Sequence, residues 1–161
     1  MKAFEEILTI VQAACNAGEA LPDPTMTPRG VKIDPSDLKN VCAKLYHDSA
    51  VFFDMLSCIT AIDNGPATGT MDVIYNLYSI PFNHQAALKI TVPRDNAEID
   101  SVQDIWKTAD WHEREAWDML GIRFKGHPDL RRILLPTDWE GHPLRKDYKQ
   151  QEYYRDIKVA Y

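Results

Sequence analysis

The residues in this sequence best suited to chemistry lie between positions 112 and 142. Three carboxylates stand close together on a segment with helical spacing, which suits general acid–base catalysis or a metal site. Three histidines in the same stretch would supply imidazole ligands. These residues are Glu113, Glu115, Asp118, His112, His127 and His142.

Their spacing argues against catalysis and against a metal. The zincin pattern H-E-x-x-H is absent because Ala116 stands where the second histidine belongs, and no two histidines have a short ligand spacing. The sequence has neither the G-x-S-x-G motif of a nucleophilic serine nor a phosphate-binding glycine loop. We therefore predict no catalytic, cofactor-binding or metal-binding residue in this chain.

A structural ion-pair network is the alternative interpretation, because arginines offer buried carboxylates bidentate partners. Arg114 and Asp118 are four residues apart and could form a pair on the helix surface. Glu113 falls on an apolar stripe, so it must be paired, lie at the stripe's edge or have a raised pKa. The predicted network comprises Glu113, Arg114, Glu115, Asp118, Arg131 and Arg132.

Composition limits the class of molecule. A length of 161 residues with 45% hydrophobic residues suffices for one compact domain. The net charge of -6 argues against a general nucleic-acid binder. Residues 1–120 carry 9 Lys/Arg against 18 Asp/Glu, whereas residues 121–161 carry 9 against 6. An acidic body and a basic tail indicate different roles for the two parts.

The cysteines and the apolar runs indicate the environment. Cys15, Cys42 and Cys58 are far apart and form no C-x-x-C pair, which predicts buried free thiols in a reducing compartment. No basic segment followed by an apolar core opens the sequence, so we expect no signal peptide. No apolar run approaches the roughly 20 residues of a membrane span. Membrane association is therefore expected only through partners.

Two helices are predicted in the first third of the chain. Apolar residues at helical spacing predict the first from position 4 to 15, before Gly18. Asp34 as N-cap and Pro35 at the first helical position predict the start of the second. The buried stripe of the second helix comprises Leu38, Val41, Cys42 and Leu45.

Strands are predicted in the middle of the chain. Residues 51–62 are apolar on both faces, as in a central strand covered on both sides. After a turn, residues 71–77 and 86–92 alternate as half-buried strands, and residues 31–33 suit a short one. The strands form an antiparallel meander with helices covering one face.

A third helix is predicted from Ser101, as N-cap, to Leu120, with a break near residues 108–110. The fold class is therefore α+β: an antiparallel sheet covered by helices, then a helix and a long extended C-terminal arm. We divide the chain into an α+β domain, residues 1–120, and an extended arm, residues 121–161, that docks on a partner. Charge, proline and large aromatics crowd the arm without a period that would let it fold alone, and Trp and Arg are typical interface anchors.

Three blocks of this region resemble one family in order and spacing over about 35 residues. They are Glu113-Arg114-Glu115 with Asp118 and Gly121, the run Gly126-His127-Pro128-Asp129-Leu130-Arg131-Arg132, and the run Asp138-Trp139-Glu140-Gly141-His142-Pro143-Leu144-Arg145-Lys146-Asp147. The sequence is similar to the C subunit of proton-pumping NADH:quinone oxidoreductase, respiratory complex I (the 30 kDa subunit family). It departs from many relatives at Lys149, where they have proline.

This resemblance implies a non-catalytic structural subunit of the quinone-reducing peripheral arm of the complex. FMN, iron–sulfur clusters and quinone are expected on partner subunits and none in this chain. The principal partner would be the D subunit of complex I, with the B and I subunits as neighbours, at the cytoplasmic face of the bacterial inner membrane. The implied docking residues are His127, Asp129, Asp138, Trp139, Glu140, His142, Arg145, Lys146 and Asp147.

Two other interpretations stay open at this stage. The same structural role fits a related ferredoxin- or F420-linked enzyme, a photosynthetic complex I-like enzyme or a membrane-bound hydrogenase. A free-standing metal-dependent enzyme is the third, and stoichiometric bound metal would favour it.

Overall fold

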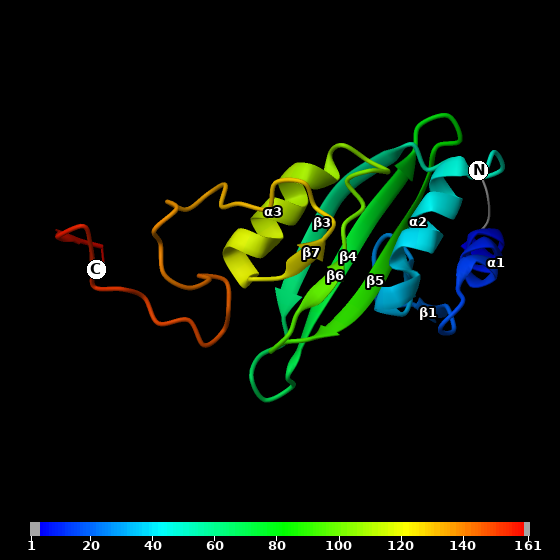
Figure 1. Ribbon diagram of the computed structural model, residues 1–161. Coiled ribbons are helices and arrows are strands. Elements are labelled where there is room, and N and C mark those ends of the chain that lie inside the picture. The colour runs from blue at the N-terminus through cyan, green and yellow to red at the C-terminus, as the bar shows by residue number, and fades with distance from the viewer. Residues whose placement is uncertain (1–3, 160–161) are drawn as a thin grey trace.

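Five strands form the main sheet of this computed structural model, which describes residues 4–159 (Figure 1). The helices are α1 (Phe4–Ala14), α2 (Leu38–His47), the short 3-10 helix η1 (Pro35–Asp37) that precedes α2, and α3 (Ala109–Leu120). The strands of the main sheet are β1 (Leu21–Asp23), β2 (Gly30–Lys32), β3 (Met55–Asp63), β4 (Thr70–Ser79) and β5 (His84–Pro93). The remaining strands are β6 (Glu98–Asp100), β7 (Arg123–Lys125), β8 (Tyr153–Tyr154) and β9 (Ile157–Lys158).

The sheet has the order β1-β2-β5-β4-β3. Its strands β3, β4 and β5 form the predicted antiparallel meander. Two pairings of this sheet were not predicted. The strand β1 pairs with β2 in antiparallel orientation, and β2 runs parallel to β5, so the sheet is mixed. Burial, and then the nearby Glu113 of α3 and Cys42 of α2, raise the pKa of Tyr75 on β4. Both helices therefore cover the same face, as expected for this α+β arrangement.

The strand predicted at residues 51–62 is present, but its predicted start and its central position in the sheet were wrong. Val51 and Phe53 are fully buried, but they lie in a turn before the strand, where Phe52 has φ 32°. The strand β3 begins at Met55 and lies at the edge of the sheet, with Ile62 43% exposed. A run of apolar residues has the same composition in a strand and in a buried turn. Composition therefore predicted neither where this strand begins nor its position in the sheet.

The start of the second helix was predicted correctly. Asp34 accepts a hydrogen bond from the backbone N–H of Ser36 (2.9 Å), and Pro35 follows it. The first turn is a 3-10 turn that ends at Asp37, a residue only 1% exposed. Its carboxylate accepts hydrogen bonds from the consecutive N–H groups of residues 16–18 (2.8–3.1 Å). This single carboxylate therefore joins the chain after α1 to the start of α2.

The third helix begins later than predicted. Ser101 caps no helix, because residues 101–108 form turns and α3 starts at Ala109, where the sequence suggested a break. The hydroxyl of Ser101 instead donates to the carboxylate of Glu113 (2.6 Å). In the same turns, Trp106 Nε1 donates to the carbonyl of Phe53 (3.0 Å). Side-chain hydrogen bonds to distant residues thus hold this segment, together with local backbone bonds, such as that from the N–H of Trp106 to the carbonyl of Val102 (3.0 Å), that do not extend into a helix.

The chain leaves the body after β7, which pairs with β6 in parallel. Residues 121–125 thus lie with the body, and the C-terminal arm is hereafter residues 126–159. Figure 1 shows it running away from the sheet beyond α3. It ends in the small β8–β9 hairpin. Short turns rather than helices or long strands make up the rest of it.

The three cysteines are free thiols. Cys42 is buried on α2 as predicted, and burial raises the pKa of its thiol. Cys15 and Cys58 are only partly buried, which corrects the prediction for those two.

Candidate functional site

The junction between α3 and the C-terminal arm brings most of the predicted site residues together. Gly121 is the C-cap that follows α3; its φ of 78° is left-handed, and its N–H donates to the carbonyl of Trp117 (2.8 Å). The carbonyls that follow in the last turn have no partner within the helix. Residues of the arm supply those partners, so the arm completes the end of the helix.

Three arm residues cap the final carbonyls of α3. His142 Nδ1 donates to the carbonyl of Asp118 (2.9 Å), and the backbone N–H of Leu144 donates to that of Met119 (3.0 Å). Arg145 Nε donates to the carbonyl of Leu120 (2.7 Å). The cationic guanidinium also suits the negative end of the helix dipole. Burial, followed by the nearby arginines, lowers the pKa of His142, which favours its neutral form.

Asp118 directs the path of the arm. Its side chain is fully buried, and one oxygen accepts hydrogen bonds from three consecutive backbone N–H groups, those of residues 133–135 (2.8–3.0 Å). The other oxygen accepts from Arg132 (2.6 Å). Burial alone would raise the pKa of Asp118, but these hydrogen bonds outweigh it and hold the pKa below its usual range. A carboxylate with four donors organises the chain and is a poor general base.

On the arm, Arg132 makes several contacts, as Asp118 does on α3. Besides Asp118, its guanidinium donates to the carbonyls of Trp139 (2.8 Å) and Gly141 (3.0 Å). It also lies over the ring of Trp117 on α3, 5.8 Å from the centroid. One arginine thus ties the helix to two later parts of the arm.

A second anchor, which the sequence analysis missed, joins the arm to the sheet. Arg94 donates two hydrogen bonds to the carboxylate of Asp63 (2.9 and 3.1 Å) and also pairs with Asp147 of the arm. Asp63 accepts further from the backbone N–H groups of Gly65 and Lys146. The Arg94 guanidinium, with these N–H groups, holds the pKa of Asp63 well below its usual range. No spacing in the sequence connects residues 63, 94 and 147.

Glu113 is not part of the arginine network, which corrects the prediction for this residue. It is fully buried and accepts from Ser101 Oγ (2.6 Å) and the N–H of Val102 (2.8 Å). His127 Nε2 lies 4.0 Å from it and 3.0 Å from Asp110. Burial raises the pKa of Glu113 to about 7. Of the alternatives open for this carboxylate, the raised pKa is the one that applies.

The remaining network residues have different partners from those predicted. Arg114 does not pair with Asp118; it donates to the backbone carbonyls of Arg131 and Arg132 (both 3.3 Å). Arg131 pairs with Asp129 at the surface (2.9 Å). Glu115 is exposed, with no ion pair to any described residue. Within residues 4–159, the pair between Arg132 and Asp118 is the one arginine–carboxylate contact that joins two members of the predicted network.

The predicted docking residues mostly have partners within the chain as well. His127, His142, Arg145 and Asp147 hold the arm to the body through the contacts already given. Asp138 pairs with Arg155 (2.8 Å) and accepts from Tyr154, and Trp139 Nε1 donates to the hydroxyl of Tyr148 (3.2 Å). Within the described chain, the side chains of Glu140 and Lys146 have no such partner. Several arm residues are therefore needed to shape the arm itself.

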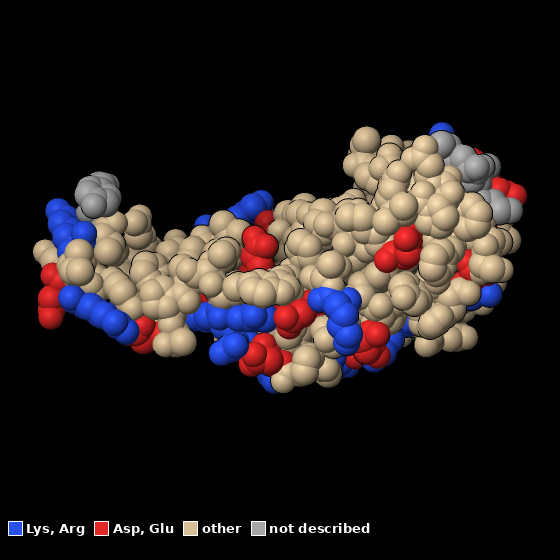
Figure 2. All heavy atoms as spheres, turned by 90° about the horizontal axis from the view of Figure 1, so that it is seen from above, with Lys and Arg blue, Asp and Glu red and all other residues tan. Residues whose placement is uncertain are grey.

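Large apolar side chains are exposed around this junction. Trp111 of α3 is 62% exposed, with Arg114 stacked over its ring at 5.4 Å. Leu134 and Leu144 of the arm are 61% and 60% exposed. Figure 2 shows Lys and Arg side chains along the arm, whereas much of the body's visible face is uncharged. Exposed Trp and Leu beside arginine match the composition of a protein interface.

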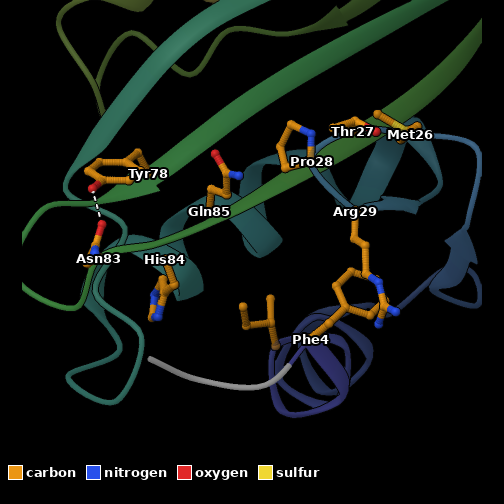
Figure 3. Close-up of a pocket in the computed structure, with 10 residues that line it drawn as sticks. Phe4, Met26, Thr27, Pro28, Arg29, Tyr78, Asn83, His84 and Gln85 are labelled. Atoms are coloured by element: carbon orange, nitrogen blue, oxygen red, sulfur yellow. Dashed lines mark hydrogen bonds between the residues drawn. The ribbon is translucent and has the colours of Figure 1, made fainter.

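A cavity of about 550 Å³ lies apart from the arm, between α1 and the ends of β4 and β5 (Figure 3). Several polar groups at its wall already have partners, among them His84, whose Nε2 donates to the carbonyl of Val51 (2.7 Å). Tyr78 donates to Asn83 (2.5 Å), and Arg29 pairs with Glu5 (3.3 Å). Phe4 and Met26 add apolar surface. This wall offers no converging set of groups for catalysis.

The described residues contain no group of three or more His, Cys, Asp or Glu side chains arranged to hold a metal ion. None of the helices within residues 4–159 has the length and apolar composition of a membrane span.

Comparisons with known proteins point to one family. The family model for the respiratory-chain NADH dehydrogenase 30 kDa subunit matches residues 31–154. The NADH-quinone oxidoreductase C subunit of Chloroherpeton thalassium is 50% identical over 115 residues, 71% of this chain and 47% of that protein. The corresponding C subunit of Chlorobium phaeobacteroides is 51% identical over 110 residues, 68% of this chain and 66% of that protein. The chain thus spans about half to two thirds of these relatives.

Solved structures share the fold. A trypsin-resistant fragment of Nqo5 superposes with a TM-score of 0.54 at 29% identity, covering 63% of this chain and 82% of the fragment. A chain of an archaeal membrane-bound sulfane sulfur reductase superposes with a TM-score of 0.73 at 23% identity. That alignment covers 90% of this chain and 85% of the archaeal one.

Proposed function

Because this chain belongs to the 30 kDa subunit family of respiratory-chain NADH dehydrogenase, we propose that it is a non-catalytic structural subunit of such an enzyme. Its place would be the quinone-reducing peripheral arm of the complex, where it supports electron transfer to quinone that is coupled to proton translocation. Its relatives are named as C subunits of NADH-quinone oxidoreductase, which supports the enzyme class.

The C-terminal arm is the observation that carries this proposal. Its contacts hold an extended path in place, while Leu134 and Leu144 of the arm and Trp111 of α3 stay exposed. An isolated enzyme gains nothing from such a surface, whereas a subunit uses it as a preorganised platform for a partner. Asp63 and Asp118 each accept four hydrogen bonds, which supports a structural role over acid–base chemistry.

The partners and cofactors follow from this assignment. The D subunit of complex I is the principal partner, with the B and I subunits as neighbours, and FMN, iron–sulfur clusters and quinone reside on those other chains. The chain is held through them at the cytoplasmic face of the bacterial inner membrane. Metal analysis and an absorption spectrum of the purified chain test the cofactor statement, since bound metal or flavin in stoichiometric amount would contradict it.

A related assembly is the second candidate. The archaeal sulfane sulfur reductase chain has the same fold, so the fold alone does not separate an NADH-linked enzyme from a ferredoxin-linked, F420-linked, photosynthetic or hydrogenase assembly. The subunits that deliver electrons to the complex would distinguish these assemblies.

Co-purification tests both candidates. A tag on this chain would be used to isolate its partners from detergent-solubilised membranes, and mass spectrometry would identify them. We expect quinone-site and cluster-bearing subunits, together with a flavin-bearing NADH-oxidising subunit. A flavin-free set with a ferredoxin-type input would favour the second candidate, and recovery of the chain alone would refute both.

Substitutions at exposed residues make the co-purification experiment more specific. Trp111→Ala should reduce the recovery of partner chains by at least about tenfold, because exposed tryptophans are frequent interface hot spots. Leu21→Ala is the matched control, since Leu21 is 52% exposed and belongs to β1, which lies far from the arm (Figure 1). Equal recovery with both variants would remove Trp111 from the docking surface. Arg145→Glu is a poorer choice, because Arg145 also caps α3.

A further inference from the structure

The two edges of the main sheet differ in how they are protected. The edge strand β1 has three residues, including Pro22 and Asp23, features that block pairing with another chain. The edge strand β3 has nine residues, Met55–Asp63, with neither proline nor lysine. Its single charged residue, Asp63, is the last one. An edge strand of this length and composition is open to pairing.

The pairing with β4 decides which backbone groups of β3 point outward. The N–H of Asn64 donates to the carbonyl of Thr70 (3.1 Å), so even-numbered residues of this antiparallel pair are directed toward β4. Ile59 and Ala61 consequently direct their N–H and C=O groups away from β4. These groups have no hydrogen-bond partner among residues 4–159.

The chain covers both ends of this edge and leaves its middle open. At one end, Thr108 Oγ1 donates to the carbonyl of Leu56 (3.3 Å). At the other end, the N–H of Lys146 donates to the carboxylate of Asp63 (2.8 Å). The open part is therefore centred on Ile59 and Ala61.

A groove of about 200 Å³, which we call the edge groove, lies beside the open part, between β3, α3 and the arm. It is lined by apolar side chains, with His112 and Glu115 beside them. Glu115 is exposed and, within the described chain, lacks an ion pair. The apolar side chains of the edge groove are Ile59, Ala61, Ala116, Met119, Leu120 and Leu144.

We propose that the β3 edge at Ile59 and Ala61 receives an extended segment of a partner subunit as an additional strand, which rests on the proposed function. Unpaired N–H and C=O groups on an edge strand recognise an extended main chain. The side chain of the added residue opposite Ile59 or Ala61 points to the same face, so it enters the edge groove and is apolar. A Lys or Arg of the same segment lies beside Glu115.

A second copy of this chain fits the edge poorly. The open part extends over about three residues, roughly 10 Å of strand, whereas a stable dimer needs about 800 Å² from each partner. Two copies would also bring together chains that each carry a net charge of -6, with two exposed Glu115 side chains at the contact. A partner segment has neither difficulty, because Leu144 connects the edge groove to the arm, where the larger contact is proposed.

Amide hydrogen exchange tests the strand addition directly. Exchange would be measured with residue resolution in the isolated full chain and in the complex purified through a tag on this chain. The N–H groups of Ile59 and Ala61 should exchange at least about tenfold more slowly in the complex. Slower exchange in the arm with no change at Ile59 and Ala61 would overturn this inference and leave the proposed function intact. Failure to recover any partner would instead refute the proposed function.

A pair of variants adds an independent readout. Ala61→Lys places a charge in the open part and should at least halve the partner recovered, while Leu21→Lys on the protected edge should leave recovery unchanged. Thermal unfolding of both isolated variants checks that they are folded, and the exchange measurement on the unmodified chain does not depend on them. If the isolated chain forms a dimer that itself slows exchange at Ile59 and Ala61, a second copy is the occupant and the inference is wrong.

Discussion

At the scale of single residues, the pKa values of two buried carboxylates on α3 are shifted in opposite directions, because their hydrogen-bond donors differ. Asp118 accepts from three backbone N–H groups and a guanidinium, and these outweigh the cost of burial, so its pKa is lowered. Glu113 accepts from one N–H and one hydroxyl and faces Asp110 nearby, so burial prevails and its pKa rises to about 7. Residue type predicts neither outcome, since the donors come from elsewhere in the chain.

Glu113 should make stability depend on pH. Its pKa is about 7 in the folded chain against an ordinary 4.5, so between these values the folded chain holds more protons than the unfolded one. Its contribution to stability is therefore complete below about pH 4.5, falls as pH rises to about 7 and is then constant, a change of at most about 3 kcal/mol. Urea unfolding across this range should show a weaker fall for Glu113→Gln than for the unmodified chain. Glu115→Gln, on the exposed face, is the control, and equal slopes for all three proteins would refute the assignment.

Asp118 should be needed for the stability of the junction. Asp118→Ala leaves Arg132 without its carboxylate and three N–H groups without their acceptor, which should cost about 3–5 kcal/mol of unfolding free energy. Asp138→Ala removes an exposed pair with Arg155 and should change stability much less. Denaturant unfolding of the two variants measures the difference between these two losses of unfolding free energy. Similar losses would mean that the arm does not depend on the buried carboxylate.

At the scale of elements, α3 and the arm depend on each other. The helix needs donors for its final carbonyls, and the arm, which has no core of its own, needs fixed acceptors to define its path. His142, Leu144 and Arg145 meet both needs at once. The close approach is possible because Gly121 has no side chain: a Cβ there would lie 2.6 Å from His142 Nε2 and 2.9 Å from a terminal nitrogen of Arg145.

Gly121→Ala should therefore lower the free energy of unfolding by more than the strain of a left-handed backbone alone would. Gly69 provides the control, because its φ of 68° is similarly left-handed but a Cβ there meets nothing within 4 Å. We expect about 1 kcal/mol of destabilisation for Gly69→Ala. Gly121→Ala should lose about 2 kcal/mol more, as the hydrogen bonds of His142 and Arg145 are displaced. Thermal or urea unfolding measures the stability of the two variants. Equal losses of stability would show that the arm accommodates the added methyl group without loss of its hydrogen bonds.

At the scale of the whole molecule, the chain is a packed body with an arm held in two regions, along α3 and at the Asp63–Arg94 pair on the sheet. After Asp147 the arm has no comparable contact with the body within residues 148–159, and its hairpin is held through Asp138 of the arm itself. Local stability should therefore fall sharply after the second anchor.

Limited trypsin digestion of the isolated chain should follow this division. Lys149 is exposed just beyond the second anchor and should be cut early, while Arg132, whose side chain is 12% exposed and hydrogen-bonded, should be cut late. Arg94→Met removes the anchor at the sheet and should make Lys146 an early site as well. Mass spectrometry of the timed fragments gives the order. Early cutting at Arg132 in the unmodified chain would contradict the two-anchor description.

Much of the secondary structure follows from the sequence alone. Apolar spacing predicted α1, the alternation in β4 and β5 predicted a meander, and Asp34 with Pro35 predicted the start of the second helix. These signals depend on residues a few positions apart, because a helical stripe, an alternating strand and a cap are properties of neighbouring residues. The three blocks from Glu113 to Asp147 likewise indicated the family.

Tertiary structure decided the order of the strands and the partner of each charge. The sequence could not place β3 at an edge, because burial of its residues depends on which strand pairs with it and on where α3 lies. It could not pair Asp63 with Arg94 or Glu113 with Ser101, since those contacts exist only once the chain has folded back on itself. Local chemistry thus determined the elements and the family, and long-range packing determined which polar groups organise the arm and which backbone groups stay open.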